Sequence, residues 1–166
     1  MAWGWKKKSG KQREKAQAAS EIDVEAKALA FLAARDHSTN ELRKKLKDRG
    51  YPMEHIDAVI KRFSEYNYLN DERVSTRLAE SLARSMWGPI QIRGKMRERG
   101  FDSDTIDQAL SEIDEEEFWI EHATRRVRSK FRKDPKEMEF DEQQKAWRHL
   151  AYRGYPGGIV KKALSS

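Results

Sequence analysis

One short phrase occurs three times in this chain and constrains its fold more than any other feature. An Arg-Gly-aromatic phrase stands at residues 49–51, 99–101 and 153–155, so its glycines, Gly50, Gly100 and Gly154, recur at a nearly constant spacing. Apolar residues lie eight and four positions before each glycine, and six and ten after it: Leu42, Leu46, Ile56 and Ile60; Ile92, Met96, Ile106 and Leu110; Ala146, Leu150, Val160 and Leu164. This spacing predicts an amphipathic helix that ends at a left-handed glycine, followed by a second amphipathic helix.

A regular period of this kind is typical of tandem helical units that cannot bury a core without neighbours. Upstream apolar stripes, such as Ala28, Leu29, Phe31 and Leu32, add a further helix to each unit. The chain is 37% hydrophobic and 37% charged, which leaves little core for its surface and fits an elongated array better than a compact enzyme. We therefore predict an all-α fold of three tandem three-helix repeats, at 25–63, 71–113 and 115–166.

Charge and composition limit the classes of partner and compartment. The net charge of +6 favours an anionic partner, and the absence of cysteine excludes disulfides and thiolate chemistry. No apolar run reaches about 20 residues, which excludes a membrane span, and the basic N-terminus is not followed by the apolar stretch of a secretory signal. We expect a cytoplasmic protein.

Residues 1–20 are rich in lysine and are predicted to be a flexible basic arm. Trp3 and Trp5 are its only large apolar groups. Such an arm serves either to solubilise the chain or to touch nucleic acid, since tryptophan stacks on bases and lysine neutralises phosphates.

Local signals mark where individual helices begin. Ser38 and Glu41 form a predicted capping box, and residues 141–144 give a second capping signal after a polar insertion at 133–141. Pro52 suits the start of the helix that follows Gly50, and residues 87–89 (Trp-Gly-Pro) turn the chain in the second repeat.

Four phrases in order resemble the signatures of the RecX family of recombinase regulators. They are Ala-Arg-Asp-His-Ser-x-x-Glu-Leu-x-x-Lys-Leu at 34–46, Tyr-Leu-Asn-Asp-Glu-Arg at 68–73, Gly-Pro-x-x-Ile-Arg at 88–93 followed by Arg-Gly-Phe at 99–101, and Leu-x-x-Arg-Gly-Tyr at 150–155. The resemblance covers about residues 25–164. It departs from the family at the Lys/Trp-rich arm and at the long insertion in the third repeat.

The resemblance implies three three-helix repeats in a curved, elongated molecule. It further implies a monomer that binds the RecA filament on single-stranded DNA and restrains its growth, ATPase and strand exchange, which would modulate recombinational repair and the SOS response. It implies neither catalysis nor a cofactor.

Enzyme signatures are missing from the sequence itself. No Walker A loop, dinucleotide-binding fingerprint, nucleophile elbow or zinc-protease motif is present. Glu117, Glu121 and His122 lie within about one helical turn, but a charged, solvated face explains them better than a metal site because no second ligand set accompanies them. The four histidines are expected to be surface or capping residues.

The candidate binding face is basic and repeats in register. Seven residues before the glycines stand Arg43, Arg93 and Trp147; five before, Lys45, Lys95 and His149; three before, Lys47, Arg97 and Ala151. Positions −7 and −3 share a helix face and are expected to be exposed. Each cation alone is consistent with ordinary solvated surface, whereas the matched set favours a face that binds RecA or DNA.

The first helix of the third repeat adds Arg125, Arg126 and Arg128 to this candidate face. Trp147 completes it because it occupies a position that is basic in the other two repeats. The aromatic residues after the glycines are expected to be core.

Two other functions fit the same residues. One is a helix-turn-helix-like DNA-binding protein, although such units are usually dimeric and are not repeated three times in a chain. The other is a helical-repeat adaptor for an acidic protein. Because no base-reading element is evident, DNA contact without RecA is expected to be weak and non-specific.

Overall fold

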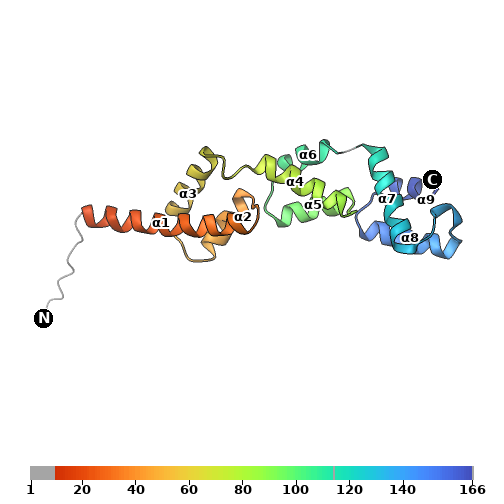
Figure 1. Cartoon of the computed structure of the whole chain (residues 1–166), viewed down its shortest axis with the longest axis horizontal. Helices are drawn as coiled ribbons and strands as arrows, with labels where there is room; N and C mark the ends of the chain where they lie inside the picture. The colour runs from red at the N-terminus through yellow and green to blue at the C-terminus, as the bar shows by residue number, and fades with distance from the viewer. Residues whose placement is uncertain (1–9, 114, 166) are drawn as a thin grey trace. The chain divides into compact units, whose positions relative to one another are not determined.

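The computed structural model describes residues 10–113 and 115–165, and this part of the chain is helical and contains no strand. It divides into two compact units at Asn70 and Asp71. The first unit holds one three-helix repeat and the second holds two (Figure 1). The predicted all-α class with three tandem three-helix repeats is confirmed.

The first repeat consists of α1 (Gly10–Ala34), α2 (Thr39–Lys47) and α3 (Met53–Glu65). Its core is formed by the predicted apolar positions of α2 and α3 together with Val24 and Ala28 of α1. Leu29, which we expected in the stripe of α1, is 42% exposed instead. The stripe of α1 therefore follows Val24, Ala28, Phe31 and Leu32.

Each Arg-Gly-aromatic phrase ends a helix in the predicted way. Gly50, Gly100 and Gly154 have φ of 83°, 83° and 87°. The glycine amide donates to the carbonyl three residues back, and the following aromatic amide donates to the carbonyl five residues back, at 3.4, 3.2 and 3.1 Å in the three repeats. This pair of bonds is the Schellman motif, and its left-handed residue is most favourable as glycine.

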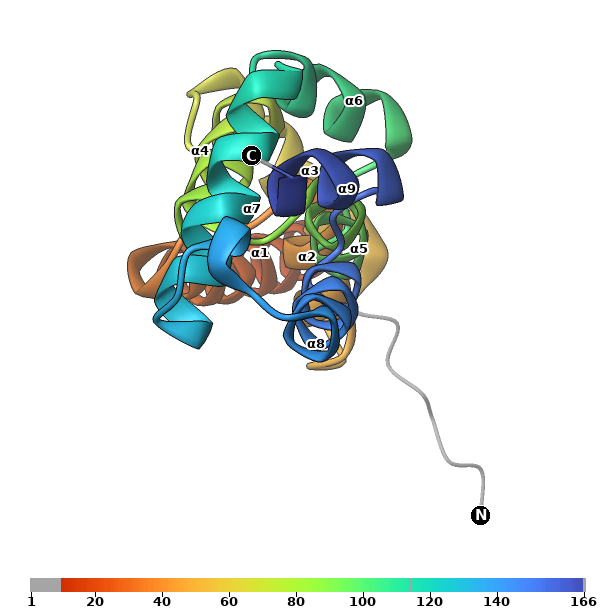
Figure 2. The same ribbon diagram turned by 90° about the vertical axis from the view of Figure 1, so that its right-hand side faces the viewer.

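The second unit contains the second and third repeats. Its helices are α4 (Asp71–Arg84), α5 (Pro89–Glu98), α6 (Ser103–Ser111), α7 (Glu116–Phe131), the short 3-10 helix η1 (Pro135–Glu137), α8 (Phe140–Tyr152) and α9 (Gly157–Ser165). In the third repeat α7 and α9 pack side by side, as both views of the ribbon show (Figure 1, Figure 2). The insertion at 133–141 was predicted to be polar, but Pro135 and Met138 within it are buried.

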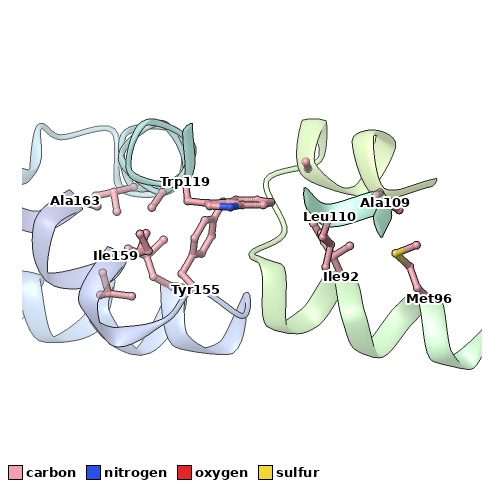
Figure 3. Packing of buried hydrophobic residues seen from close by; sticks show 14 of the residues in the cluster. Ile92, Met96, Ala109, Leu110, Trp119, Tyr155, Ile159 and Ala163 are labelled. Atoms are coloured by element: carbon pink, nitrogen blue, oxygen red, sulfur yellow. The ribbon is translucent and has the colours of Figure 1, made fainter. Parts of the chain in front are cut away.

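One continuous core joins these two repeats. It runs from Ile92, Met96 and Leu110 of the second repeat to Ile159 and Ala163 of the third. Trp119 and Tyr155, each 2% exposed, lie beside one another between the two sets (Figure 3). Tyr155 and Phe101 are thus core residues as predicted, while Tyr51 is only partly buried.

The two repeats also dock backbone to backbone. The Gly88 amide donates to the Arg153 carbonyl at 2.8 Å, and the Ile90 amide donates to the Gly154 carbonyl at 3.1 Å. A Cβ atom on Gly88 would lie 2.4 Å from the carbonyl carbon of Gly154. The third phrase therefore ends α8 and also seats the third repeat on the start of α5.

Two predicted boundaries differ from the structure. Helix α1 begins at Gly10, so the second half of the predicted flexible arm is helical, in keeping with its Ala, Lys, Gln and Glu content. The rest of the arm, residues 1–9, lies outside the described residues. Helix α8 is capped at Glu139 by a capping box with Glu142, slightly before the predicted cap at Asp141.

Candidate binding surface

The arginines at position −7 are held by acids of their own repeat. Arg43 forms an ion pair with Asp57 at 3.1 Å, and Arg93 pairs with Asp107 in the same way. Both positions were predicted to be exposed, and both arginine side chains are 37% exposed, which leaves them partly covered. Each pair ties the second helix of a repeat to its third helix, which gives these arginines a structural role whatever they bind.

The lysines at position −5 lie over aromatic rings. The Lys45 Nζ is 5.1 Å from the centre of the Phe31 ring, and the Lys95 Nζ is 4.2 Å from the Trp87 ring. The arginines that precede the glycines, Arg49 and Arg153, lie over the same two rings. The first and second repeats therefore each carry an aromatic ring with at least two cations over it. This arrangement is favourable because the ring quadrupole attracts positive charge.

The remaining members of the predicted face are more open. Lys47, Arg97 and Arg125 are exposed. Arg128 is exposed but pairs with Asp134 at 2.7 Å. Arg126 is half-buried and donates from Nε to the Nε2 of His149 at 2.9 Å. The members of the predicted face therefore differ in exposure, and several of them are already paired within the chain.

Four cations gather where the second and third repeats meet, and we call them the junction cluster: Lys95, Arg126, Lys130 and Arg153. Burial, followed by the charges of Arg126, Arg153 and Lys130, lowers the pKa of His149. Burial and then the charge of Arg126 lower the pKa of Arg153. Both shifts have the sign that neighbouring cations produce. The junction cluster is a site of positive potential, and an anion bound there would reduce the repulsion among its cations.

The Trp87 ring and the Ser85 carbonyl hold Arg153 of the junction cluster in place. The guanidinium of Arg153 lies 3.8 Å from the centre of the Trp87 ring and donates to the Ser85 carbonyl at 2.7 Å. Burial raises the pKa of Tyr155 to about 12, so this phenol stays neutral beside the cations. Trp87 therefore links α5, through Lys95, to the end of α8, through Arg153.

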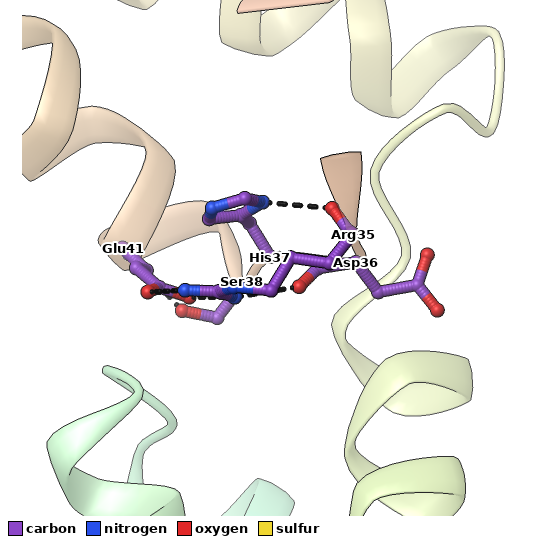
Figure 4. A network of polar contacts seen from close by, with 5 residues as sticks. All are labelled: Arg35, Asp36, His37, Ser38 and Glu41. Atoms are coloured by element: carbon purple, nitrogen blue, oxygen red, sulfur yellow. Dashed lines mark hydrogen bonds and ion pairs between the residues drawn. The ribbon is translucent and has the colours of Figure 1, made fainter. Parts of the chain in front are cut away.

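Side chains of the phrase at 34–46 fix the connection between the end of α1 and the start of α2. Arg35 binds the Glu41 carboxylate and donates to the Asp36 carbonyl at 2.8 Å, while the Glu41 amide donates to the Ser38 hydroxyl at 3.0 Å (Figure 4). His37 is 2% exposed and contacts the Arg35 carbonyl through Nδ1 at 2.9 Å. The histidines were expected to be surface or capping residues; His37 and His55, which is 5% exposed, are buried and not on the surface.

The acidic cluster on α7 does not form a metal site. His122 stacks on Phe118 with 3.9 Å between ring centres, and its Nδ1 contacts the Phe118 carbonyl at 2.9 Å. Among residues 10–113 and 115–165, no group of three or more His, Asp or Glu side chains is placed to hold a metal ion. The helices of these residues are also too short or too polar to cross a membrane.

Sequence reasoning missed Arg153 of the junction cluster. Arg153 belongs to the repeated phrase and looked like part of a helix end, because its contact with Trp87 joins two different repeats that are distant in the sequence. The arginine that recurs directly before each glycine, at Arg49, Arg99 and Arg153, is the sequence signal that could have indicated it. Trp147 lies apart from the cluster, on the flank of α8 that faces α9, where it is 41% exposed.

The fold and this surface define an all-helical repeat protein that carries a cluster of cations where its second and third repeats meet. Family models agree with the three repeats: the first RecX three-helix domain matches residues 26–63, the second 70–110 and the third 116–164. The chain belongs to the RecX family.

Individual relatives support this membership. The chain is 35% identical over 146 residues to Regulatory protein RecX of Pseudomonas savastanoi pv. phaseolicola, which covers 87% of this chain and 91% of that protein. It is 36% identical over 140 residues to the protein of the same name from Salmonella paratyphi A, covering 78% and 82%.

Two solved structures share the fold. A crystal structure of regulatory protein RecX superposes with a TM-score of 0.80 at 20% identity, covering 100% of this chain and 82% of that one. RecX from Lactobacillus salivarius gives a TM-score of 0.76 at 16% identity, covering 89% and 96%.

Proposed function

We propose that this chain is a non-enzymatic regulator of RecA. It binds the RecA filament on single-stranded DNA and inhibits filament growth, ATP hydrolysis and strand exchange, acting as a monomer in the cytoplasm. Membership of a family of regulatory proteins supports this proposal, and so does a surface whose most distinctive chemistry is positive charge.

The junction cluster is the observation that carries the proposal. Its cations repel one another in the isolated chain, and this repulsion is relieved when phosphates or carboxylates approach. A RecA filament on DNA offers both kinds of anion. Because Trp87 and the docked third repeat fix Lys95 and Arg153 in place, little side-chain freedom is lost on binding.

Inhibition then follows from occupancy. A chain bound to the filament covers surface that an incoming RecA subunit or a second DNA strand needs. It stabilises its own complex with the filament, and it catalyses no reaction. The exposed cations Arg97 and Arg125 of the second unit, and Lys47 of the first unit, add to the attraction at long range.

The test is a variant that removes charge from the junction cluster without reversing it: Lys95→Gln, Arg126→Gln and Lys130→Gln together. Glutamine at 126 keeps an N–H that can donate to His149, and the loss of like-charge repulsion offsets the loss of the Lys95 contact with Trp87. The RecA ATPase on single-stranded DNA is measured against concentration of the chain. We expect the parent to inhibit and the variant to need at least about tenfold more protein.

A matched control removes three charges elsewhere: Lys44→Gln, Lys61→Gln and Lys136→Gln, all outside the junction cluster. It should inhibit like the parent, although it has the same net charge as the variant. Histidine NMR verifies the variant, since the pKa of His149 should rise part of the way toward its ordinary value when Arg126 and Lys130 are gone, while burial and Arg153 still lower it. A parent that leaves the ATPase unchanged refutes the function. A folded variant that still inhibits like the parent refutes the junction cluster as its site.

A further inference from the structure

A hollow of about 480 Å³ lies between α8 and α9 of the third repeat. Its lining includes Phe140, Gln143, Gln144, Trp147, Arg148 and Lys161. We call it the α8–α9 hollow. None of its lining residues, all of them described, is acidic, although the chain as a whole carries 28 Asp and Glu residues.

The hollow stands where the other repeats place an ion pair. Counting from the glycines, Trp147 corresponds to Arg43 and Arg93, and Lys161 corresponds to Asp57 and Asp107. The third repeat has thus replaced the arginine by an aromatic ring and the acid by a cation. The bond that ties the second helix to the third in the first two repeats is therefore replaced in the third by an aromatic surface beside a positive charge.

Helix α8 also begins earlier than its counterparts. Its cap, Glu139, precedes Gly154 by about one helical turn more than Ser38 precedes Gly50 or Gly88 precedes Gly100. The extra turn carries Phe140, which is 73% exposed. Two large aromatic side chains, Phe140 and Trp147, thus remain in contact with water at one hollow, which costs hydrophobic free energy in the isolated chain.

We propose that the α8–α9 hollow binds a base of single-stranded nucleic acid. Trp147 and Phe140 supply aromatic surface on which a base can stack, and the amides of Gln143 and Gln144 can both donate to and accept from its edge. Lys161 and Arg148 supply charge for the adjoining phosphates. This combination of stacking rings with cations is the general chemistry of single-strand binding.

An acidic peptide is the competing occupant, and the side chains favour it less. A carboxylate needs cationic donors, which Lys161 and Arg148 supply, but it leaves two exposed aromatic rings and two amides unmatched. A base with its phosphates matches all three kinds of group. The volume of the hollow also lies in the range of pockets that enclose small planar ligands.

The test uses the chain without RecA, so it is independent of the function proposed above. Binding of a short fluorescent oligothymidylate is compared with binding of an abasic oligomer of the same length, which has the same phosphates and no bases, at low salt. We expect the parent to prefer the oligothymidylate by about tenfold, since stacking on one aromatic residue is worth roughly 1–3 kcal/mol. Trp147→Ala should remove most of this preference.

Two further variants separate stacking from charge and from general surface effects. Lys161→Gln should weaken binding of both oligonucleotides by the same factor, because it removes a phosphate contact. Tyr152→Ala removes a 73% exposed aromatic residue of the same helix outside the hollow, and it should keep the parent's preference.

Several results would overturn the proposal. They are no measurable binding of the parent to either oligonucleotide, equal binding of both, or a folded Trp147→Ala variant that keeps the full preference. A Trp147-dependent complex with a Glu/Phe peptide, together with equal binding of the two oligonucleotides, would assign the hollow to a protein partner instead.

Discussion

Gly88 gives the sharpest test of how the second and third repeats are joined. It is the N-cap of α5, with φ of −80°, a conformation open to any residue. N-caps favour serine over glycine, and the first repeat uses Ser38 at the equivalent position. Considered as a cap alone, Gly88→Ser should stabilise the chain by a few tenths of a kcal/mol.

The docked third repeat reverses this expectation. A Cβ on Gly88 would lie 2.4 Å from the Gly154 backbone, where ordinary contact begins at 3.4 Å, so the two repeats must separate by about 1 Å. Such a shift weakens two backbone hydrogen bonds, each worth about 0.5–1.5 kcal/mol, and strains the shared core by a further ~1–3 kcal/mol. We expect a net loss of about 2–4 kcal/mol.

Thermal unfolding followed by tryptophan fluorescence measures this loss, because Trp87, Trp119 and Trp147 all lie in the second unit. A loss of about 2 kcal/mol or more should lower the melting temperature by roughly 8 °C or more for a unit of this size. Gly94→Ala, inside the same helix, is the control. Its Cβ would meet nothing within 4 Å, and alanine should stabilise the helix by about 0.5–1 kcal/mol. A Gly88→Ser variant as stable as the parent would refute the docking of the two repeats.

Three other predictions follow from single residues. Gly100→Val should cost about 1 kcal/mol or more because its φ is 83°, while Glu98→Gln should leave the melting curve nearly unchanged. Burial lowers the pKa of His37, so the contribution of this histidine to the free energy of unfolding is complete above about pH 6.5 and is lost as the pH falls below that value. Urea midpoints measured from about pH 7.5 to 5 should therefore fall less steeply in His37→Gln than in the parent. A double-mutant cycle with Arg93→Ala and Asp107→Ala should give a coupling of about 0.2–1 kcal/mol that weakens with salt, and zero coupling at low salt would contradict the ion pair.

The helices were predictable because their cause is local. Apolar residues four apart and a glycine at the end specify a helix and its stop within a short stretch of chain, and Leu42, Leu46 and Gly50 behave as this rule requires. The boundary errors are local as well. The Glu139–Glu142 capping box was passed over for a similar signal just after it, and α1 extends through residues that a basic composition had suggested were flexible.

The binding surface was less predictable because its geometry depends on contacts across helices. Arg43 and Arg93 share a helix face with the exposed Lys47 and Arg97, respectively, but their acids stand 14 residues away on another helix. Helical periodicity says which face a residue lies on, and it says nothing of what the next helix presents to that face. His37 illustrates the same limit, since its burial depends on how α1 meets α2.

The repeated phrase shows how one sequence pattern acquires a second task. Gly50 and Gly154 have nearly the same positive φ, and each ends its helix with the same two hydrogen bonds. A Cβ on Gly50 would meet nothing within 4 Å, whereas one on Gly154 would lie 2.4 Å from the Gln91 amide nitrogen. The first glycine is therefore required only by its own backbone, and the third is required also by the repeat before it. Because Arg153 precedes Gly154, the contact that joins the two repeats also places its guanidinium over Trp87 and beside Arg126, so the junction cluster is a direct consequence of how these repeats dock.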